Sequence, residues 1–103
     1  MDYSFKSEIM KKILKISDEL QGHYALKNQL ERSATSIGAN IREAQYAHGK
    51  ADFIAKLQIA LKEANETGYW LELLFKTNYI TEAEYTSLDS ACTSIRVMLI
   101  SSI

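Results

Sequence analysis

The side chains of this chain that could do chemistry are few, and a metal site is the first kind to test. A carboxylate-bridged pair of metal ions in a helical bundle needs a Glu-x-x-His motif on each of two helices, with single glutamates from the other two. The only histidines are His23 and His48, and neither has a glutamate three residues before it. Glu19 precedes His23 by four residues, but Gly22 places that pair at the end of a predicted helix. The sequence therefore predicts no metal and no cofactor.

Nucleophilic catalysis finds no better support in the residues. It would need a serine or cysteine beside a positioned base and an orienting acid. The serines are scattered, and both histidines fall at predicted helix ends. Cys92 is the only cysteine and lies in a helical apolar series, which favours a buried, inert thiol and rules out an intramolecular disulfide. We therefore predict a non-enzymatic protein with no catalytic residues and no small-molecule substrate.

A polar stripe stands out instead. One flank of the second predicted helix carries five polar residues, and Arg32 lies at its edge. The five are Gln29, Ser33, Ser36, Asn40 and Glu43. On the next helix, Glu63 and Glu66 lie among large apolar residues, and a carboxylate in such surroundings is costly unless it is paired.

Two interpretations of these residues remain open. They could form a hydrogen-bonded network at a subunit boundary, or both stripes could be solvated with Trp70 only half covered. The first is favoured, because an exposed group of large apolar residues would be unusual for a monomer. The predicted subunit interface consists of Ile59, Glu63, Glu66, Trp70 and Leu73.

Four amphipathic helices must position these side chains. Apolar residues recur at steps of three and four over residues 4–20, 24–47, 52–78 and from Thr81 to residue 103. Gly22 and Gly49 suit the ends of the first two helices, and Gly38 predicts a bend or a close backbone approach inside the second. Thr81 and Glu84 match a capping box. Short connections favour an all-α, antiparallel up-down-up-down four-helix bundle, with residues 1–103 as a single domain.

The helix predicted over residues 52–78 carries two apolar stripes, whereas one small bundle needs only one. A seam with helical spacing is expected to face the bundle, and a second stripe with Ile59, Trp70 and Leu73 lies roughly opposite. The second stripe points most simply to another copy of the chain. The residues of the predicted seam are Ile54, Leu57, Leu61, Ala64, Gly68, Leu71 and Phe75.

Composition excludes several other classes. Of the 103 residues, 47% are apolar, none is proline and four are glycine, which argues against disorder and against an all-β fold. The net charge of −1 argues against a protein whose main affinity is for a phosphate backbone. A basic patch stays possible on the first helix, with Lys6, Lys11, Lys12 and Lys15, although a solvated surface explains these lysines better. No apolar stretch could span a membrane, so we expect a cytoplasmic protein.

The run from Gln29 to Ala44 resembles the signature helix of the bacterial four-helix-bundle proteins encoded in intervening sequences of large-subunit ribosomal RNA genes. That family typically shows Gln-Leu-Arg-Arg-Ala, followed by Ser-Ile-Pro-x-Asn-Ile-x-Glu-Gly. Gly38 stands where the family usually has proline, and Ala44 where it has glycine. The segment from Asp52 to Leu71 resembles the family's third helix. The matching residues of the signature are Arg32, Ser36, Ile37, Asn40, Ile41 and Glu43.

The resemblance implies a four-helix bundle that assembles as a ring-shaped homopentamer, in a family whose cellular role is largely undefined. We therefore expect a homo-oligomeric interaction scaffold whose main partner is itself. A related branch of the family serves diversity-generating retroelements. The alternative expectation is thus a nucleic-acid-binding accessory protein that acts with ribosomal RNA or a reverse transcriptase.

Overall fold

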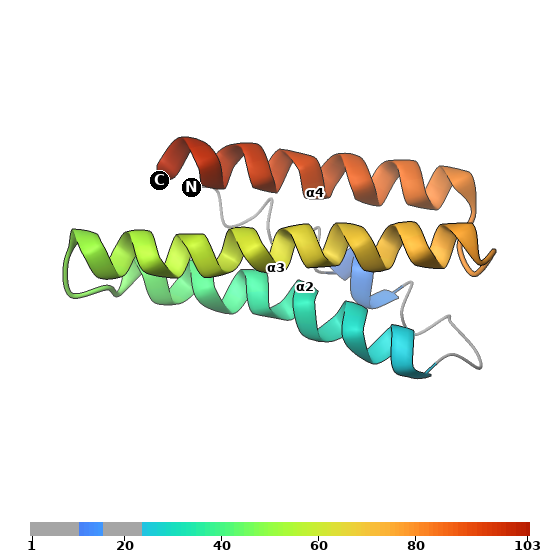
Figure 1. Cartoon of the computed structure of the whole chain (residues 1–103), viewed down its shortest axis with the longest axis horizontal. Helices are drawn as coiled ribbons and strands as arrows, with labels where there is room; N and C mark the ends of the chain where they lie inside the picture. The colour runs from blue at the N-terminus through green and yellow to red at the C-terminus, as the bar shows by residue number, and fades with distance from the viewer. Residues whose placement is uncertain (1–10, 16–23) are drawn as a thin grey trace.

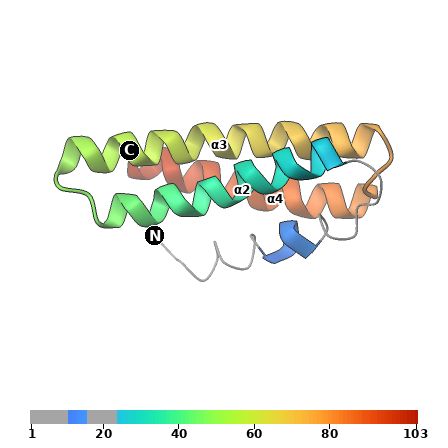
Figure 2. The same ribbon diagram turned by 90° about the horizontal axis from the view of Figure 1, so that it is seen from below.

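The structure of the chain is a computed structural model that describes residues 11–15 and 24–103. Three long helices follow one another, α2 (Tyr24–Gln45), α3 (Lys50–Lys76) and α4 (Glu82–Ser102), and residues 11–15 are also helical. Consecutive helices run antiparallel, with α3 packed along both α2 and α4 (Figures 1 and 2). This confirms the all-α, antiparallel four-helix bundle. The parts of the first predicted helix over residues 4–10 and 16–20 lie outside the described residues.

The second predicted helix ends earlier than expected. We predicted it to continue to residue 47, but α2 ends at Gln45. The N–H groups of Tyr46 and Ala47 bond to the carbonyls three residues back, which tightens the chain into a turn. Gly49, expected to end that helix, instead occupies the N-cap position of α3. α2 itself is continuous through Gly38.

The third helix ends two residues before the predicted position because Asn78 adopts a left-handed conformation, with φ of 66°. The N–H of Tyr79 donates to the carbonyl of Leu74 at 2.9 Å, and that of Asn78 donates to the carbonyl of Phe75 at 3.0 Å. These two bonds are those of a Schellman motif, in which asparagine is a common substitute for glycine.

The start of α4 confirms the capping box. Thr81 Oγ1 accepts from the N–H of Glu84 at 3.1 Å, and Glu84 Oε1 accepts from the N–H of Thr81 at 2.8 Å. Ile80, just before this box, is buried. One helix is thus ended and the next begun within residues 77–81.

The buried face of α3 differs from the predicted seam. Leu57, Ala64 and Leu71 are buried as expected, but the other predicted seam residues are only half-buried. The remaining buried positions are Ala60, Glu63, Thr67 and Leu74. The reason is that α3 packs against two helices, so its buried face is wider than one seam and is rotated towards α2.

None of the helices in residues 11–15 and 24–103 combines the length and the apolarity that a membrane crossing demands.

Candidate functional site

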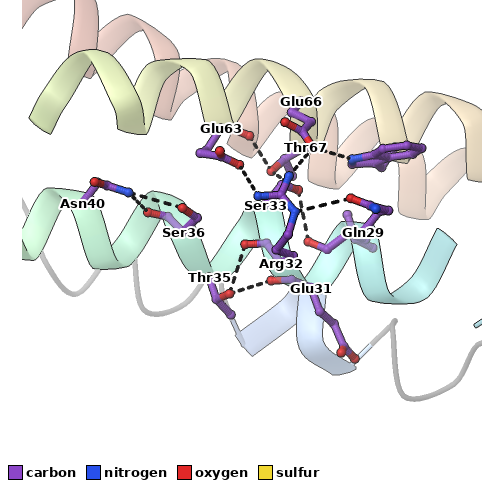
Figure 3. A network of polar contacts seen from close by, with 12 residues as sticks. Gln29, Glu31, Arg32, Ser33, Thr35, Ser36, Asn40, Glu63, Glu66 and Thr67 are labelled. Carbon is purple, nitrogen blue, oxygen red and sulfur yellow. Dashed lines mark hydrogen bonds and ion pairs between the residues drawn. The ribbon is translucent and has the colours of Figure 1, made fainter. Parts of the chain in front are cut away.

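An arginine of α2 holds two glutamates of α3 at the middle of the bundle (Figure 3). Arg32 Nη1 donates to Glu63 Oε2 at 3.3 Å, and Arg32 Nη2 donates to Glu66 Oε1. Only 8% of the surface of Glu63 is exposed to solvent, so its carboxylate depends on Arg32 as a partner. Arg32 thus neutralises two carboxylates that neighbouring turns of α3 bring to one place.

Two further side chains extend the network. Trp70 Nε1 donates to Glu66 Oε1 at 3.3 Å, and Arg32 Nε donates to Gln29 Oε1 at 3.3 Å. The ring of Trp70 packs against the core and meets the ring of Tyr69 edge-on, with centroids 4.9 Å apart. The tryptophan therefore belongs to the polar network through its N–H and to the core through its ring.

Beneath the arginine lies a buried pair of hydroxyls. Thr67 Oγ1 donates to Ser33 Oγ at 2.9 Å, and Ser33 Oγ donates to the carbonyl of Leu30 at 3.3 Å. Thr67 Oγ1 also lies 2.8 Å from the carbonyl oxygen of Glu63. Both residues are fully buried, so this pair joins α2 to α3 inside the core.

The polar stripe predicted on the second helix continues towards its C-terminus. Asn40 Nδ2 donates to the carbonyl of Ser36 at 2.9 Å and lies 3.3 Å from its hydroxyl, and both residues are half-buried. Glu43 is exposed and forms an ion pair of 3.0 Å with Lys56 of α3. Arg32 and Glu43 thus reach across to α3, while Ser36 and Asn40 bond within α2.

The ion pairs shift the pKa values of the two most involved groups. The hydrogen bond from Arg32 holds the pKa of Glu66 below its ordinary value of 4.5, and the Trp70 N–H acts in the same direction. Burial opposes both effects. The hydrogen bond to Glu66 in turn raises the pKa of Arg32. Both groups are therefore charged at neutral pH.

The five residues of the predicted subunit interface fall into two groups. Glu63, Glu66 and Trp70 are engaged within the chain itself, by Arg32 and by the core. Ile59 is 42% exposed, and Leu73 is half-buried at the surface of α3. The network predicted for a subunit boundary thus exists and joins α2 to α3 within one chain. That these residues also meet a second copy stays a prediction.

Of the lysines proposed as a nucleic-acid contact, Lys11, Lys12 and Lys15 are exposed on the helical residues 11–15, where Ile13 is buried. Lys6 lies outside the described residues. That these lysines bind nucleic acid stays a prediction.

Cys92 is buried, as the sequence predicts, and its Sγ lies 3.3 Å from the carbonyl oxygen of Ala64. Burial raises the pKa of its thiol to about 11, so at pH 8 roughly one thiol in a thousand is ionised. We expect the folded protein to resist alkylation by iodoacetamide at pH 8 and to react fully in denaturant. Rapid alkylation of the folded protein would show that the thiol is accessible.

Sequence reasoning missed Thr67 and Lys56. The buried series Ala60, Ala64, Thr67, Leu71 and Leu74 has the same three-and-four spacing as the predicted seam, and following it would have placed Thr67 in the core. Lys56 carries no such pattern, because an ion pair between helices follows from their packing rather than from the spacing within either helix.

This arrangement joins α2 to α3 through hydrogen bonds and ion pairs. Within residues 11–15 and 24–103, every buried side-chain nitrogen or oxygen has a hydrogen-bond partner. No cluster of three potential metal ligands occurs in the same ranges. The carboxylates are thus occupied by Arg32 and the Trp70 N–H.

Comparison with known proteins shows which proteins the chain is similar to. A family model described as 23S rRNA-intervening sequence protein matches residues 3–101. A crystal structure from Bacteroides thetaiotaomicron VPI-5482, described as a protein of unknown function from the S23 ribosomal protein family, is 50% identical with a TM-score of 0.94. The match covers 97% of this chain and 95% of that one. No curated protein matches the chain.

Proposed function

Because the chain belongs to the 23S rRNA-intervening sequence protein family, we propose that it is a non-enzymatic, homo-oligomeric scaffold of the cytoplasm. The observation that carries this proposal is the contrast between the polar network and the outer surface. The network is satisfied within the chain, whereas Tyr69, Val97 and Ile100 leave 57%, 58% and 61% of their surfaces exposed on the outside of α3 and α4. An apolar outer surface on a rigid bundle is suited to contacts between subunits.

The resemblance of the signature helix to the family implies the subunit number, a ring of five. Light scattering coupled to size-exclusion chromatography tests it directly. We expect a particle of five 11.7-kDa chains at micromolar concentration. A stable monomer at that concentration would overturn the proposal.

A second candidate function rests on the exposed lysines of residues 11–15. A ring would repeat Lys11, Lys12 and Lys15 around its axis and so concentrate positive charge from a chain whose net charge is only −1. Such a surface would bind structured RNA or DNA, with affinity that falls steeply as salt rises. Absence of binding at low ionic strength would remove this candidate.

A further inference from the structure

The turn between α2 and α3 projects from the end of the bundle. α3 has 27 residues and α4 has 21, so the start of α3 extends about 9 Å beyond the end of α4. Figure 1 shows the turn standing clear of the C-terminal end of α4. Every residue from 42 to 50 is exposed except Ala44 and Ala47. We call residues 42–50 the α2–α3 tip.

The tip carries an exposed aromatic ring beside a cation. Tyr46 is 77% exposed, the highest value among the large apolar and aromatic side chains of residues 11–15 and 24–103. Arg42 is also exposed and lies one helical turn earlier, which places the two side chains on the same side of α2. The ring of Tyr46 therefore adds little to the core and is available to stack on a planar group.

The carboxylates near the tip already have partners, whereas two of its cations do not. Glu43 forms its ion pair of 3.0 Å with Lys56, and Asp52 Oδ2 accepts from a backbone N–H of the tip at 3.4 Å. In the part of the chain that the structure describes, neither Arg42 nor Lys50 forms an ion pair. The tip thus presents positive charge that the net charge of −1 does not reveal.

The described residues leave the space over Gly49 open. A Cβ atom built on Gly49 would meet no atom within 4 Å. Its φ of 174° is extended backbone that any residue adopts, so the fold does not require a glycine at this position. The bare backbone between Tyr46 and Lys50 instead leaves room for another molecule to approach closely.

We infer that the α2–α3 tip binds a single-stranded nucleic acid, with an unpaired base stacked on Tyr46 and neighbouring phosphates contacted by Arg42 and Lys50. Aromatic stacking platforms and cations along the backbone are the two means by which proteins hold unpaired strands. An acidic protein segment would use the cations but would leave the exposed ring without a role. This inference rests on the second candidate function and adds a separate contact to it, because residues 11–15 lie towards the other end of the bundle (Figure 2).

Fluorescence anisotropy of a labelled oligouridine strand, titrated with the full chain at low ionic strength, tests the stacking contact. Tyr46→Ala should weaken binding about tenfold, whereas Tyr46→Phe keeps the ring and should bind as the wild type does. Gln45→Ala is the matched control, because Gln45 is exposed beside Tyr46 but carries neither a ring nor a charge. Oligothymidine should bind about as tightly as oligouridine, since neither contact involves the 2′-hydroxyl group.

The salt dependence of the same titration tests the phosphate contacts. Arg42→Ala and Lys50→Ala each remove one cation, so each should reduce the slope of log affinity against log salt concentration by about one. Lys62→Ala is the control, because Lys62 is an exposed lysine of α3 outside the tip. Circular dichroism should show the same helix content in all of these variants, because the substituted side chains are exposed.

Competitors identify the partner. An abasic strand, a blunt duplex and polyglutamate should each displace oligouridine less well than an unlabelled single strand does. Equal displacement by any of the three would overturn the inference, and so would unchanged binding in Tyr46→Ala.

The lysines of residues 11–15 separate this inference from the second candidate function. If replacement of Lys11, Lys12 and Lys15 by alanine abolishes binding while Tyr46→Ala retains it, that function stands and the inference fails. If the wild-type protein binds no nucleic acid at low ionic strength, both fail.

Discussion

The Arg32→Ala variant will unfold several degrees below the wild-type protein at pH 7, and part of this loss will disappear at pH 5. Without the guanidinium, the carboxylates of Glu63 and Glu66 keep their places on α3 but lose the cation that both contact. Glu63 is nearly covered, so solvent cannot replace the lost partner well. Loss of Arg32 therefore leaves the covered carboxylate of Glu63 without its cation, and this costs more than the ion pair itself contributes.

The dependence on pH has opposite signs in the two proteins. In the wild type, the pKa of Glu66 is lowered below 4.5, so this group stabilises the fold above that pH, and the contribution is lost as pH falls through the lower, folded-state value. In Arg32→Ala, the burial of Glu66 remains without the opposing hydrogen bond from Arg32, and it should raise the pKa of Glu66 instead. Folding then favours the protonated carboxyl, and stability increases as pH falls.

Thermal unfolding followed by circular dichroism between pH 7 and pH 5 measures both effects. Arg42→Ala is the matched control, because Arg42 lies exposed on the same helix. Arg32→Lys should recover part of the stability, but a single ammonium group cannot replace the two guanidinium nitrogens that donate to Glu63 and Glu66. If the unfolding temperatures of Arg32→Ala and of the wild type change with pH by the same amount, the two carboxylates do not depend on Arg32.

The second large effect is expected at Trp70. Trp70→Ala should lower the free energy of unfolding by about 2–3 kcal/mol, less than for a fully buried tryptophan because the residue is half-buried. Trp70→Phe keeps the ring against the core and loses only the bond from Nε1 to Glu66, so about 1 kcal/mol is expected. Urea unfolding measures both variants. Equal losses would mean that the N–H, and not the ring, carries the contribution.

Trp70→Ala also separates an effect on folding stability from an effect on assembly. If the subunit interface includes Trp70, then Trp70→Ala should lower the particle mass at concentrations at which Lys11→Ala does not. If Trp70→Ala costs stability but leaves the mass unchanged, the tryptophan serves only the core of its own chain. Glu66→Ala provides the same comparison for the polar part of the network.

The fold could be predicted because its signals are local. The three-and-four spacing of apolar residues identifies the helices, and Thr81 with Glu84 marks the start of α4 within one residue. The predicted helix ends were less accurate at positions where the backbone conformation of single residues determines the end of a helix. Asn78 adopts a left-handed conformation that no sequence pattern required, and Gly49 precedes α3 rather than ending α2.

The residues of the network could be predicted from the sequence, but the contact that they make between α2 and α3 within one chain could not. Arg32, Glu63 and Glu66 were recognisable, because carboxylates among apolar residues need a partner. Which surface supplies that partner depends on how α3 is rotated between its neighbours, and spacing along one helix does not determine that rotation. The buried Thr67 illustrates the same limit, because its place in the core follows from the wide face that α3 presents to α2 and α4.

The turn over residues 77–81 has a consequence for the order of folding. It joins an ending motif at Asn78 directly to the capping box at Thr81, so α3 and α4 can meet after closing a very short loop. Such closure takes on the order of a hundred nanoseconds or less and costs little chain entropy. The hairpin of α3 and α4 should therefore be among the earliest structures to form.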